Sequence, residues 1–369
     1  MPSPKSKPWF PVLALCLAHA GCVPLPEAIP TREVDRSVPA SFGADTAPLA
    51  SAAAMPVERF FDDANLRALI DEALANNQER NILQMEIAIA NAEVLARVGE
   101  YQPQVGVGAG AGLERVGRFT SQGASDADDA ITPGRLVPED LPNYRIGFFA
   151  SWELDLWGRL RGAGRAAMLR ASGTVEGRNL LTTRLVAEIA RSYYELMALD
   201  NELQVLERNI EIQNQALEVV RRQKDAARVT ELAVQRFEAE VLHNRSRLFD
   251  VRQQVVETEN RINLLVGRFP QPVARSSAGF LLLEPTAVAT GLPAELLTNR
   301  PDLRRAELQL AAADLDVSVA RARYYPSLSL EAGAGVEAFE LSRLSFWPES
   351  VFYGVVGGLA ALRAIAASG

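Results

Sequence analysis

The sequence predicts an α+β membrane protein, in which long α-helical coiled-coil hairpins are combined with β-strands that contribute to a transmembrane β-barrel. Two observations predict this fold class. One proline-free stretch repeats apolar residues every seven positions, which is typical of coiled coils. Two shorter stretches alternate apolar residues with glycine or polar residues, which is typical of strands with two unlike faces.

The helical stretch extends from residue 158 to residue 267 of the 369-residue chain and contains no proline. We expect helices over about 159–223 and 231–266, joined by a turn at 225–231. A strict seven-residue repeat predicts coiled-coil packing between them, because a straight amphipathic helix drifts off this period. The first helix alone would be roughly 100 Å long at 1.5 Å per residue. The repeating positions are Leu196, Leu199, Leu203, Leu206, Ile210, Gln213, Leu217 and Val220 in the first helix, and Val234, Phe237, Val241, Leu248, Val251, Val255, Ile262 and Leu265 in the second.

Two strands are predicted over 105–113 and 143–155, where apolar residues occupy every second position. A helical pattern over about 62–100 precedes the first strand and is ended by Pro103. Between the strands, residues 116–142 are rich in glycine, serine, aspartate and proline, which predicts a long exposed loop. The aromatic residues of the second strand and its end fit either a lipid interface or ordinary strand packing; they are Tyr144, Phe148, Trp152 and Trp157.

The N-terminus has the pattern of an export signal. Lys5 and Lys7 precede an apolar stretch at 9–18, and small residues stand directly before Cys22. This resembles a lipobox, in which the cysteine is acylated and becomes the first residue of the mature chain. His19 stands where that pattern prefers leucine. The alternatives are an ordinary cleaved signal, or Cys22 as an inert small residue.

Composition argues against several classes of function. The net charge of −8 opposes binding to nucleic acid, which needs a basic face. After removal of the signal, His243 and Cys22 are the only histidine and cysteine, so neither a zinc cluster nor a histidine-based catalytic dyad can form. No phosphate-binding GxxxxGK[ST] motif is present. We therefore expect no enzyme activity and no cofactor, and we expect His243 on the surface of a charged helix.

The chain contains an internal repeat. Sliding the sequence on itself aligns Leu69–Gly112 with Leu292–Gly335 without a gap, and 13 of the 44 aligned pairs are identical. The identical pairs include a Tyr-x-Pro motif where the helical pattern stops and an Ala-Gly-Ala-Gly motif in the strand. Such self-similarity indicates a duplicated unit of helix and strand.

Three stretches resemble one known family. They are SWELDLWGRLR at 151–161, RVTELAVQRFEAEV at 228–241 and LPAELLTNRPDLRRAELQLAAA at 292–313. They are similar to the TolC/OprM-type outer-membrane efflux factors, in particular the lipoprotein or NodT-like branch. The resemblance covers nearly the whole mature chain, although the glycine usual near the hairpin tip is absent.

The resemblance implies a homotrimer in which each chain gives four strands to one twelve-stranded barrel, while the helices form a periplasmic tunnel. It implies passive export of drugs, solvents or metal ions. The partners would be a periplasmic adaptor (membrane fusion) protein and an inner-membrane pump of the resistance-nodulation-division (RND) class. It places the chain in the outer membrane, anchored by lipid at Cys22 and extending into the periplasm. By analogy, the hairpin tip would contact the adaptor, or else be a simple solvated turn; its residues are Lys224, Asp225, Arg228, Thr230 and Glu231.

The resulting domain prediction is a signal peptide at 1–21, a lipid-anchored tether at 22–60, a first efflux repeat at 61–291 and a second repeat at 292–369. The first repeat ends in a mixed segment, in which residues 280–283 form a short strand at most. Compared with the first repeat, the second lacks a long hairpin, so we expect a C-terminally truncated member of the family.

Two alternatives to an efflux channel remain open, and a third is excluded. A lipid-anchored coiled-coil scaffold without a pore would not need the two alternating strand stretches. A truncated channel fragment without function is also compatible with the sequence. A periplasmic enzyme is excluded because no convergent set of catalytic groups is present.

Overall fold

The computed structural model describes residues 37–39, 55–284 and 292–360, which form two compact units. The strand unit contains the described residues of 95–166 and 313–360, and the helical unit contains those of 36–94 and 167–312. The predicted signal peptide, Cys22 and most of the tether lie outside the described residues.

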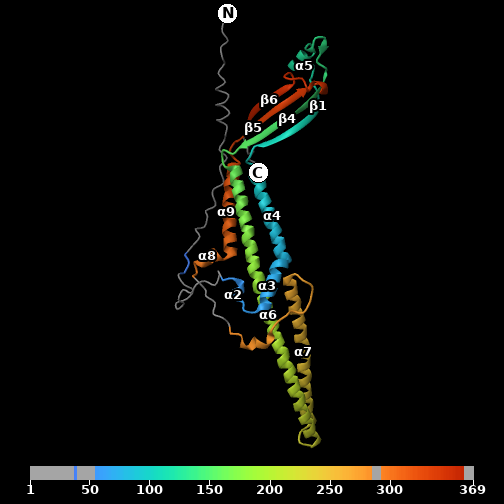
Figure 1. Cartoon of the computed structure of the whole chain (residues 1–369), viewed down its shortest axis with the longest axis vertical. Coiled ribbons are helices and arrows are strands. Elements are labelled where there is room, and N and C mark those ends of the chain that lie inside the picture. Colours follow the sequence, from blue (N-terminus) through green and yellow to red (C-terminus); the bar gives the residue numbers. More distant parts are fainter. Residues whose placement is uncertain (1–36, 40–54, 285–291, 361–369) are drawn as a thin grey trace, which may run out of the picture. The chain divides into compact units, whose positions relative to one another are not determined.

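The strand unit is built on a four-stranded antiparallel sheet with the order β1-β4-β5-β6 (Figure 1). Both predicted strands are present, and each is longer at its N-terminal end than expected. The repeat supplies the other two strands. The strands are β1 (Gln104–Arg115), β4 (Asp140–Leu154), β5 (Ser327–Ala338) and β6 (Val351–Ala360).

The connection between β1 and β4 is more ordered than predicted. It contains α5 (Ser121–Asp126) and a small hairpin of β2 (Ala130–Thr132) and β3 (Arg135–Leu136). The predicted long exposed loop thus contains short regular elements. Short-range capping explains the difference, because the Thr120 hydroxyl accepts a hydrogen bond from the backbone N–H of Gly123 in the first turn of α5. The connection between β5 and β6 contains η3 (Leu341–Arg343).

The helical unit consists of helices and one 3-10 segment, and three of its helices continue into residues of the strand unit. The long helix and its returning partner begin and end within two residues of their predicted bounds. Among the described helices, none is both long and apolar enough to cross a membrane. The elements are α2 (Val57–Phe60), α3 (Ala64–Asn76), α4 (Gln78–Gly99), α6 (Arg159–Asp225), α7 (Glu231–Val266), η2 (Ser277–Leu282), α8 (Glu295–Asn299) and α9 (Pro301–Ala322).

The helix predicted over 62–100 is divided at Asn77, whose backbone is extended with ψ at 125°. The Asn77 side-chain oxygen accepts a hydrogen bond from the N–H of Arg80, which caps the start of α4. Its amide nitrogen donates to the carbonyl of Leu265, 2.9 Å away in α7. A tertiary hydrogen bond thus stabilises a break that apolar periodicity does not reveal.

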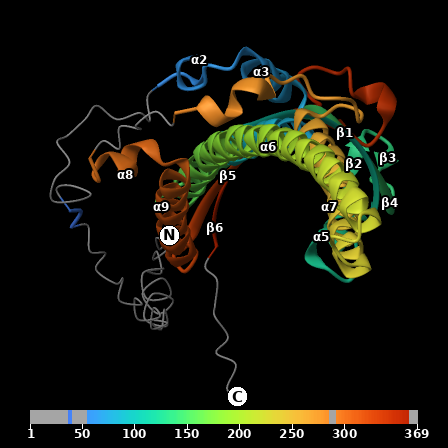
Figure 2. The same cartoon turned by 90° about the horizontal axis from the view of Figure 1, so that it is seen from below.

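The predicted coiled-coil seam between α6 and α7 is confirmed, and the two helices lie side by side in both views (Figures 1 and 2). One cluster of the seam contains Leu199, Leu206 and Val251, and a second, nearer the tip, contains Leu217, Val234 and Val241. The prediction that Phe237 lies in the seam is wrong, because 39% of this residue is exposed.

The main core of the helical unit lies where α3 packs against α6 and α7. Its fully buried members are Leu66, Ile70, Ala73, Ile189, Tyr193, Leu196, Ile262 and Val266. The hydroxyl of Tyr193 donates a hydrogen bond to Asp63, 2.8 Å away, and Asp63 in turn caps α3.

The mixed segment after α7 is fixed to the hairpin by ion pairs. The Arg275 guanidinium donates hydrogen bonds to Asp200 of α6 and to Glu259 of α7, each with a shortest distance of 2.5 Å. Residues 280–283, predicted as a short strand at most, instead belong largely to the 3-10 helix η2. No neighbouring strand is available here for pairing among the described residues, so local hydrogen bonds close the turn.

Candidate functional site

The first candidate site is the four-stranded sheet, because one of its faces is largely apolar and the other is polar. Directly paired residues of an antiparallel sheet point to the same face, and the register is continuous across all four strands. Apart from the paired residues Arg115 and Asp140 at its end, one face carries no charged side chain from β1 to β6. Its uncharged residues are Val105, Val107, Ala109, Ala111, Leu113, Pro142, Tyr144, Ile146, Phe148, Ala150, Trp152, Leu154, Leu328, Leu330, Ala332, Ala334, Val336, Ala338, Val351, Tyr353, Val355, Gly357 and Leu359.

This apolar face is open in the strand unit. Exposed fractions are 73% at Val107, 64% at Phe148 and 76% at Val355. An exposed apolar area of this extent marks a surface that contacts another apolar phase or partner. Phe148 is one of the aromatic residues for which lipid contact and ordinary packing both remained open.

The two tryptophans are fixed by backbone carbonyls at the end of β4. The indole N–H of Trp152 donates to the carbonyl of Tyr101 at 3.0 Å, and that of Trp157 donates to Pro326 at 2.7 Å. The Trp157 ring also stacks on Tyr325, with ring centroids 4.7 Å apart. Their polar groups are thus satisfied, while half of Trp157 stays exposed.

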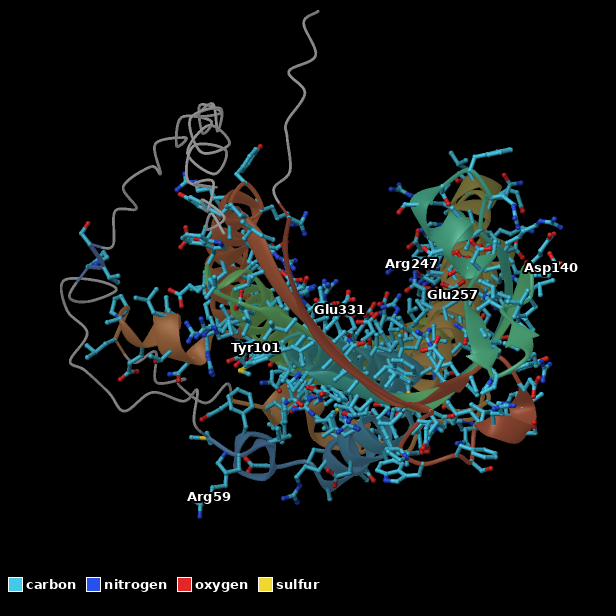
Figure 3. All side chains as sticks on the ribbon, turned by 90° about the horizontal axis from the view of Figure 1, so that it is seen from above. Arg59, Tyr101, Asp140, Arg247, Glu257 and Glu331 are labelled. Carbon is cyan, nitrogen blue, oxygen red and sulfur yellow. The ribbon has the colours of Figure 1, made fainter. Side chains whose placement is uncertain are left out.

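The opposite face of the sheet is polar and rich in glycine. It is the concave side of the curved sheet in Figure 3, where Glu331 is labelled. Its small residues allow close approach of strands, since a Cβ on Gly147 would lie 2.6 Å from the carbonyl oxygen of Ala334. Its polar members are Gln104, Glu114, Asn143, Arg145, Ser151, Glu153, Ser327, Ser329, Glu331 and Glu337.

Sequence reasoning followed only the apolar positions of the strands and missed three residues of the polar face. Phe149 and Phe352 stack there with ring centroids 6.1 Å apart, and the Arg145 guanidinium lies 5.1 Å from the Phe149 ring centre. The sequence could have indicated these residues, because Phe149 and Phe352 occupy positions of their strands that otherwise hold polar residues or glycine. The pairing of β4 with β5 and of β5 with β6, which brings the rings together, was not readable from either strand alone.

The second candidate site is the turn between α6 and α7. Its backbone forms a Schellman motif: the N–H of Ala227 donates to the carbonyl of Lys224, and that of Arg228 to the carbonyl of Gln223, each at 2.8 Å. Ala227 has a φ of 55°, in the left-handed region that favours glycine. An alanine therefore has a glycine-like conformation at a tip that lacks the glycine usual in the family.

Of the five tip residues predicted as adaptor contacts, the structure brings two together. The Lys224 ammonium forms an ion pair with Glu231, 2.9 Å away, and this carboxylate raises the pKa of Lys224. Asp225, Arg228 and Thr230 are exposed, and the Thr230 side chain makes no cap hydrogen bond to α7. The tip therefore presents charged groups to solvent, and its role in adaptor contact stays a prediction.

Neither site has the chemistry of a metal centre. Among the described residues, no group of three or more His, Cys, Asp or Glu could hold a metal ion. His243 is exposed on α7, as expected.

The chain thus combines a sheet that has one apolar and one polar face with a long helical hairpin. The family model described as "Outer membrane efflux protein" matches residues 69–268 and 292–353. The chain therefore belongs to the outer membrane efflux protein family.

Two curated relatives illustrate the range of the family. The chain is 26% identical over 285 residues to the cation efflux system protein CusC of Escherichia coli O6:H1, which covers 77% of this chain and 58% of CusC. It is 28% identical over 356 residues to the solvent efflux pump outer membrane protein SrpC of Pseudomonas putida, which covers 92% and 70% of the two chains. This chain thus spans less than two thirds of the length of CusC.

The fold is also that of solved channels. The open state of the Neisseria gonorrhoeae MtrE outer membrane channel matches with a TM-score of 0.74 and 20% sequence identity. The match covers 90% of this chain and 71% of MtrE.

Proposed function

We propose that this chain is a subunit of an outer-membrane channel that exports small molecules passively, as one component of a tripartite efflux system. The observation that carries the proposal is the sheet with a polar, glycine-rich face and an apolar face whose charged residues, Arg115 and Asp140, lie at its end. Such strands suit a barrel wall with lipid outside and water inside. The names of the relatives, which include cation and solvent efflux proteins, support this class of cargo.

Closure of the barrel would require further copies of the chain. In the described sheet, β1 and β6 each pair on one side only, and an open strand edge is not compatible with a lipid environment. Three copies would give twelve strands, as the family resemblance implies. In this organisation β1 and β4 belong to the first repeat, and β5 and β6 to the second.

The helical hairpin also has unpartnered apolar positions that suit assembly. Besides the seam between α6 and α7, each helix carries a second apolar series with a seven-residue spacing that stays exposed. The residues are Val205, Ile212 and Val219 on α6, and Leu242, Phe249 and Val256 on α7. A second seam of this kind fits packing against neighbouring hairpins in a periplasmic tunnel.

The remaining parts of the proposal follow from the family. Acylation at Cys22 would anchor the chain in the outer membrane, and the tip with Lys224 and Glu231 would contact a periplasmic adaptor. An inner-membrane pump of the RND class would supply the energy. The coiled-coil scaffold is a weaker candidate, because it gives no role to an open apolar sheet face.

Conductance in a planar lipid bilayer tests the proposal. The full-length protein, purified in detergent, is expected to elute as a trimer and to insert as a pore with stable single-channel openings. A monomeric protein that gives no openings in repeated insertions would overturn the channel proposal and favour the scaffold or the non-functional fragment.

A further inference from the structure

The polar face of the sheet contains a pair of phenylalanines, Phe149 and Phe352, surrounded by glycines. We call these glycines the glycine floor. Phe149 and Phe352 lie in two neighbouring rows of paired residues across the sheet. All the remaining positions of these two rows are glycines. The two phenyl rings are therefore the only side chains of these rows. The glycines are Gly106, Gly108, Gly147, Gly333, Gly335 and Gly354.

The rings lie directly on this floor. A Cβ added to Gly108 would be 3.1 Å from the Phe149 ring, and one added to Gly147 would be 3.1 Å from the Phe352 ring. The two ring planes are 28° apart, and their centroids are 6.1 Å apart.

A planar cation already occupies this surface. The Arg145 guanidinium carbon lies 5.1 Å from the centre of the Phe149 ring and 6.0 Å from that of Phe352. Both distances are within the range of cation–π attraction. Within the part of the chain that the structure describes, no ion pair or hydrogen bond holds the Arg145 guanidinium elsewhere.

A pocket of about 600 Å³ opens beside the rings, and we call it the aromatic pocket. It is lined by both phenyl rings and Arg145, and by Gln104, Ser151 and Glu331 of the adjacent row of paired residues. The Glu331 carboxylate has no ion-pair or hydrogen-bond partner among the described residues. The pocket thus combines aromatic faces with an unpaired negative charge.

We propose that the aromatic pocket binds planar organic cations, which take the place of the Arg145 guanidinium on the two rings while Glu331 balances their charge. The inference rests on the proposed function, in which the polar face lines the export path. It extends that function by naming a substrate class and the residues that select it.

When a cation displaces the Arg145 guanidinium from the rings, a carboxylate on the neighbouring strand can pair with it. Glu337 is the direct cross-strand neighbour of Arg145 on the same face, and its carboxylate accepts one hydrogen bond from Asn143. Since the cation–π contact of Arg145 is exposed, a cargo cation can replace it without leaving a buried charge unpaired. Weak, exchangeable binding also suits a path through which cargo must leave as readily as it enters.

The test uses ethidium, a planar aromatic cation, titrated by fluorescence anisotropy against the full-length protein in detergent. We expect saturable binding that Arg145→Gln tightens about 3-fold to 10-fold, because the competing guanidinium is removed. Glu331→Gln should weaken binding about 5-fold or more, and Phe352→Leu should weaken it further. Glu139→Gln, which removes a carboxylate outside the pocket, is the matched control and should leave the affinity unchanged.

Two results would overturn the inference. One is an Arg145→Gln variant that binds ethidium no more tightly than the wild type. The other is an aromatic anion, 8-anilinonaphthalene-1-sulfonate, that binds with the same dependence on Glu331. Glu331→Gln and Arg145→Gln change no core packing, so the test does not depend on Phe352→Leu folding. Bilayer conductance of the same preparations separates the two proposals: pores without selective ethidium binding refute only the pocket, whereas absence of pores refutes the channel.

Discussion

The side-chain amide of Asn244 donates a hydrogen bond to the side-chain oxygen of Gln213, 2.9 Å away across the seam between α6 and α7. Asn244 is buried, with 8% of its surface exposed. The pair separates the two apolar clusters of the seam, one containing Leu206 and the other Leu217. A polar pair at one layer of a coiled coil fixes the register of its helices at a cost in stability.

Gln213→Leu alone should destabilise the hairpin by about 1–3 kcal/mol, because it leaves the buried Asn244 amide without its partner. The double variant Gln213→Leu/Asn244→Leu should recover that loss and approach or exceed the stability of the wild type. Thermal unfolding of the wild type, of Gln213→Leu, of Asn244→Leu and of the double variant gives a double-mutant cycle. His243→Ala, at the exposed neighbouring position, is the control. Additive effects of the two single substitutions would contradict a coupled pair.

Ala227→Gly should stabilise the hairpin tip by about 1 kcal/mol, because the left-handed conformation of Ala227 costs an alanine roughly that amount. Ala226→Gly, one position earlier, should have the opposite sign, since Ala226 does not have a positive φ. Hydrogen exchange at the C-terminal turn of α6 reports both effects locally. Equal changes in protection for the two variants would show that Ala227 is not strained.

Local signals explain what the sequence predicted well. The bounds of α6 and α7 follow from an apolar repeat and from the lack of proline, both of which are properties of contiguous residues. Non-local contacts explain what it missed. The break at Asn77 depends on the Leu265 carbonyl, 188 positions away. The ring pair depends on strands β4 and β6, which meet only through β5. The alternation of apolar residues along each strand predicted the apolar face. It could not predict which residues of neighbouring strands pair with one another.

Ser192→Ala should stabilise the helical unit by about 1 kcal/mol. Ser192 is fully buried, and its hydroxyl has no hydrogen-bond partner among the described residues. Removing an unsatisfied buried hydroxyl relieves its desolvation cost and leaves a methyl group in an apolar core. Ser172→Ala is the control, because that hydroxyl is exposed and bonds the carbonyl of Met168. Denaturant unfolding measures both, and a destabilised Ser192→Ala variant would indicate a hidden partner for the hydroxyl.

Acid should weaken the attachment of the mixed segment to the hairpin. Burial alone would raise the pKa of Asp200, but hydrogen bonds from Arg275 and Ser277 outweigh it and hold this pKa below the ordinary value. A depressed carboxyl pKa contributes stability above the unfolded value of about 3.9, and the contribution is lost as the pH falls through the folded pKa.

Asp200→Asn should therefore lower the unfolding free energy at neutral pH by about 1.5–3 kcal/mol, since hydrogen bonds to a charged group are lost. It should also flatten the decline of stability below about pH 4. Asp250→Asn, at an exposed position of α7, should leave the acid profile as it is. The measurement is the unfolding midpoint as a function of pH, and parallel acid profiles for wild type and Asp200→Asn would refute the assignment.

Adjacent positions of β1 provide the sharpest test of which face meets lipid. Val107→Arg places a charge on the apolar face and should destabilise the inserted protein by about 2–4 kcal/mol if the site lies near the bilayer midplane. Gly106→Arg places the same side chain on the polar face, where a Cβ meets no atom within 4 Å, so insertion should persist. Folding into lipid vesicles, followed by tryptophan fluorescence under a urea gradient, compares the two. Equal tolerance of both arginines, or loss of insertion only for Gly106→Arg, would reverse the proposed orientation of the sheet.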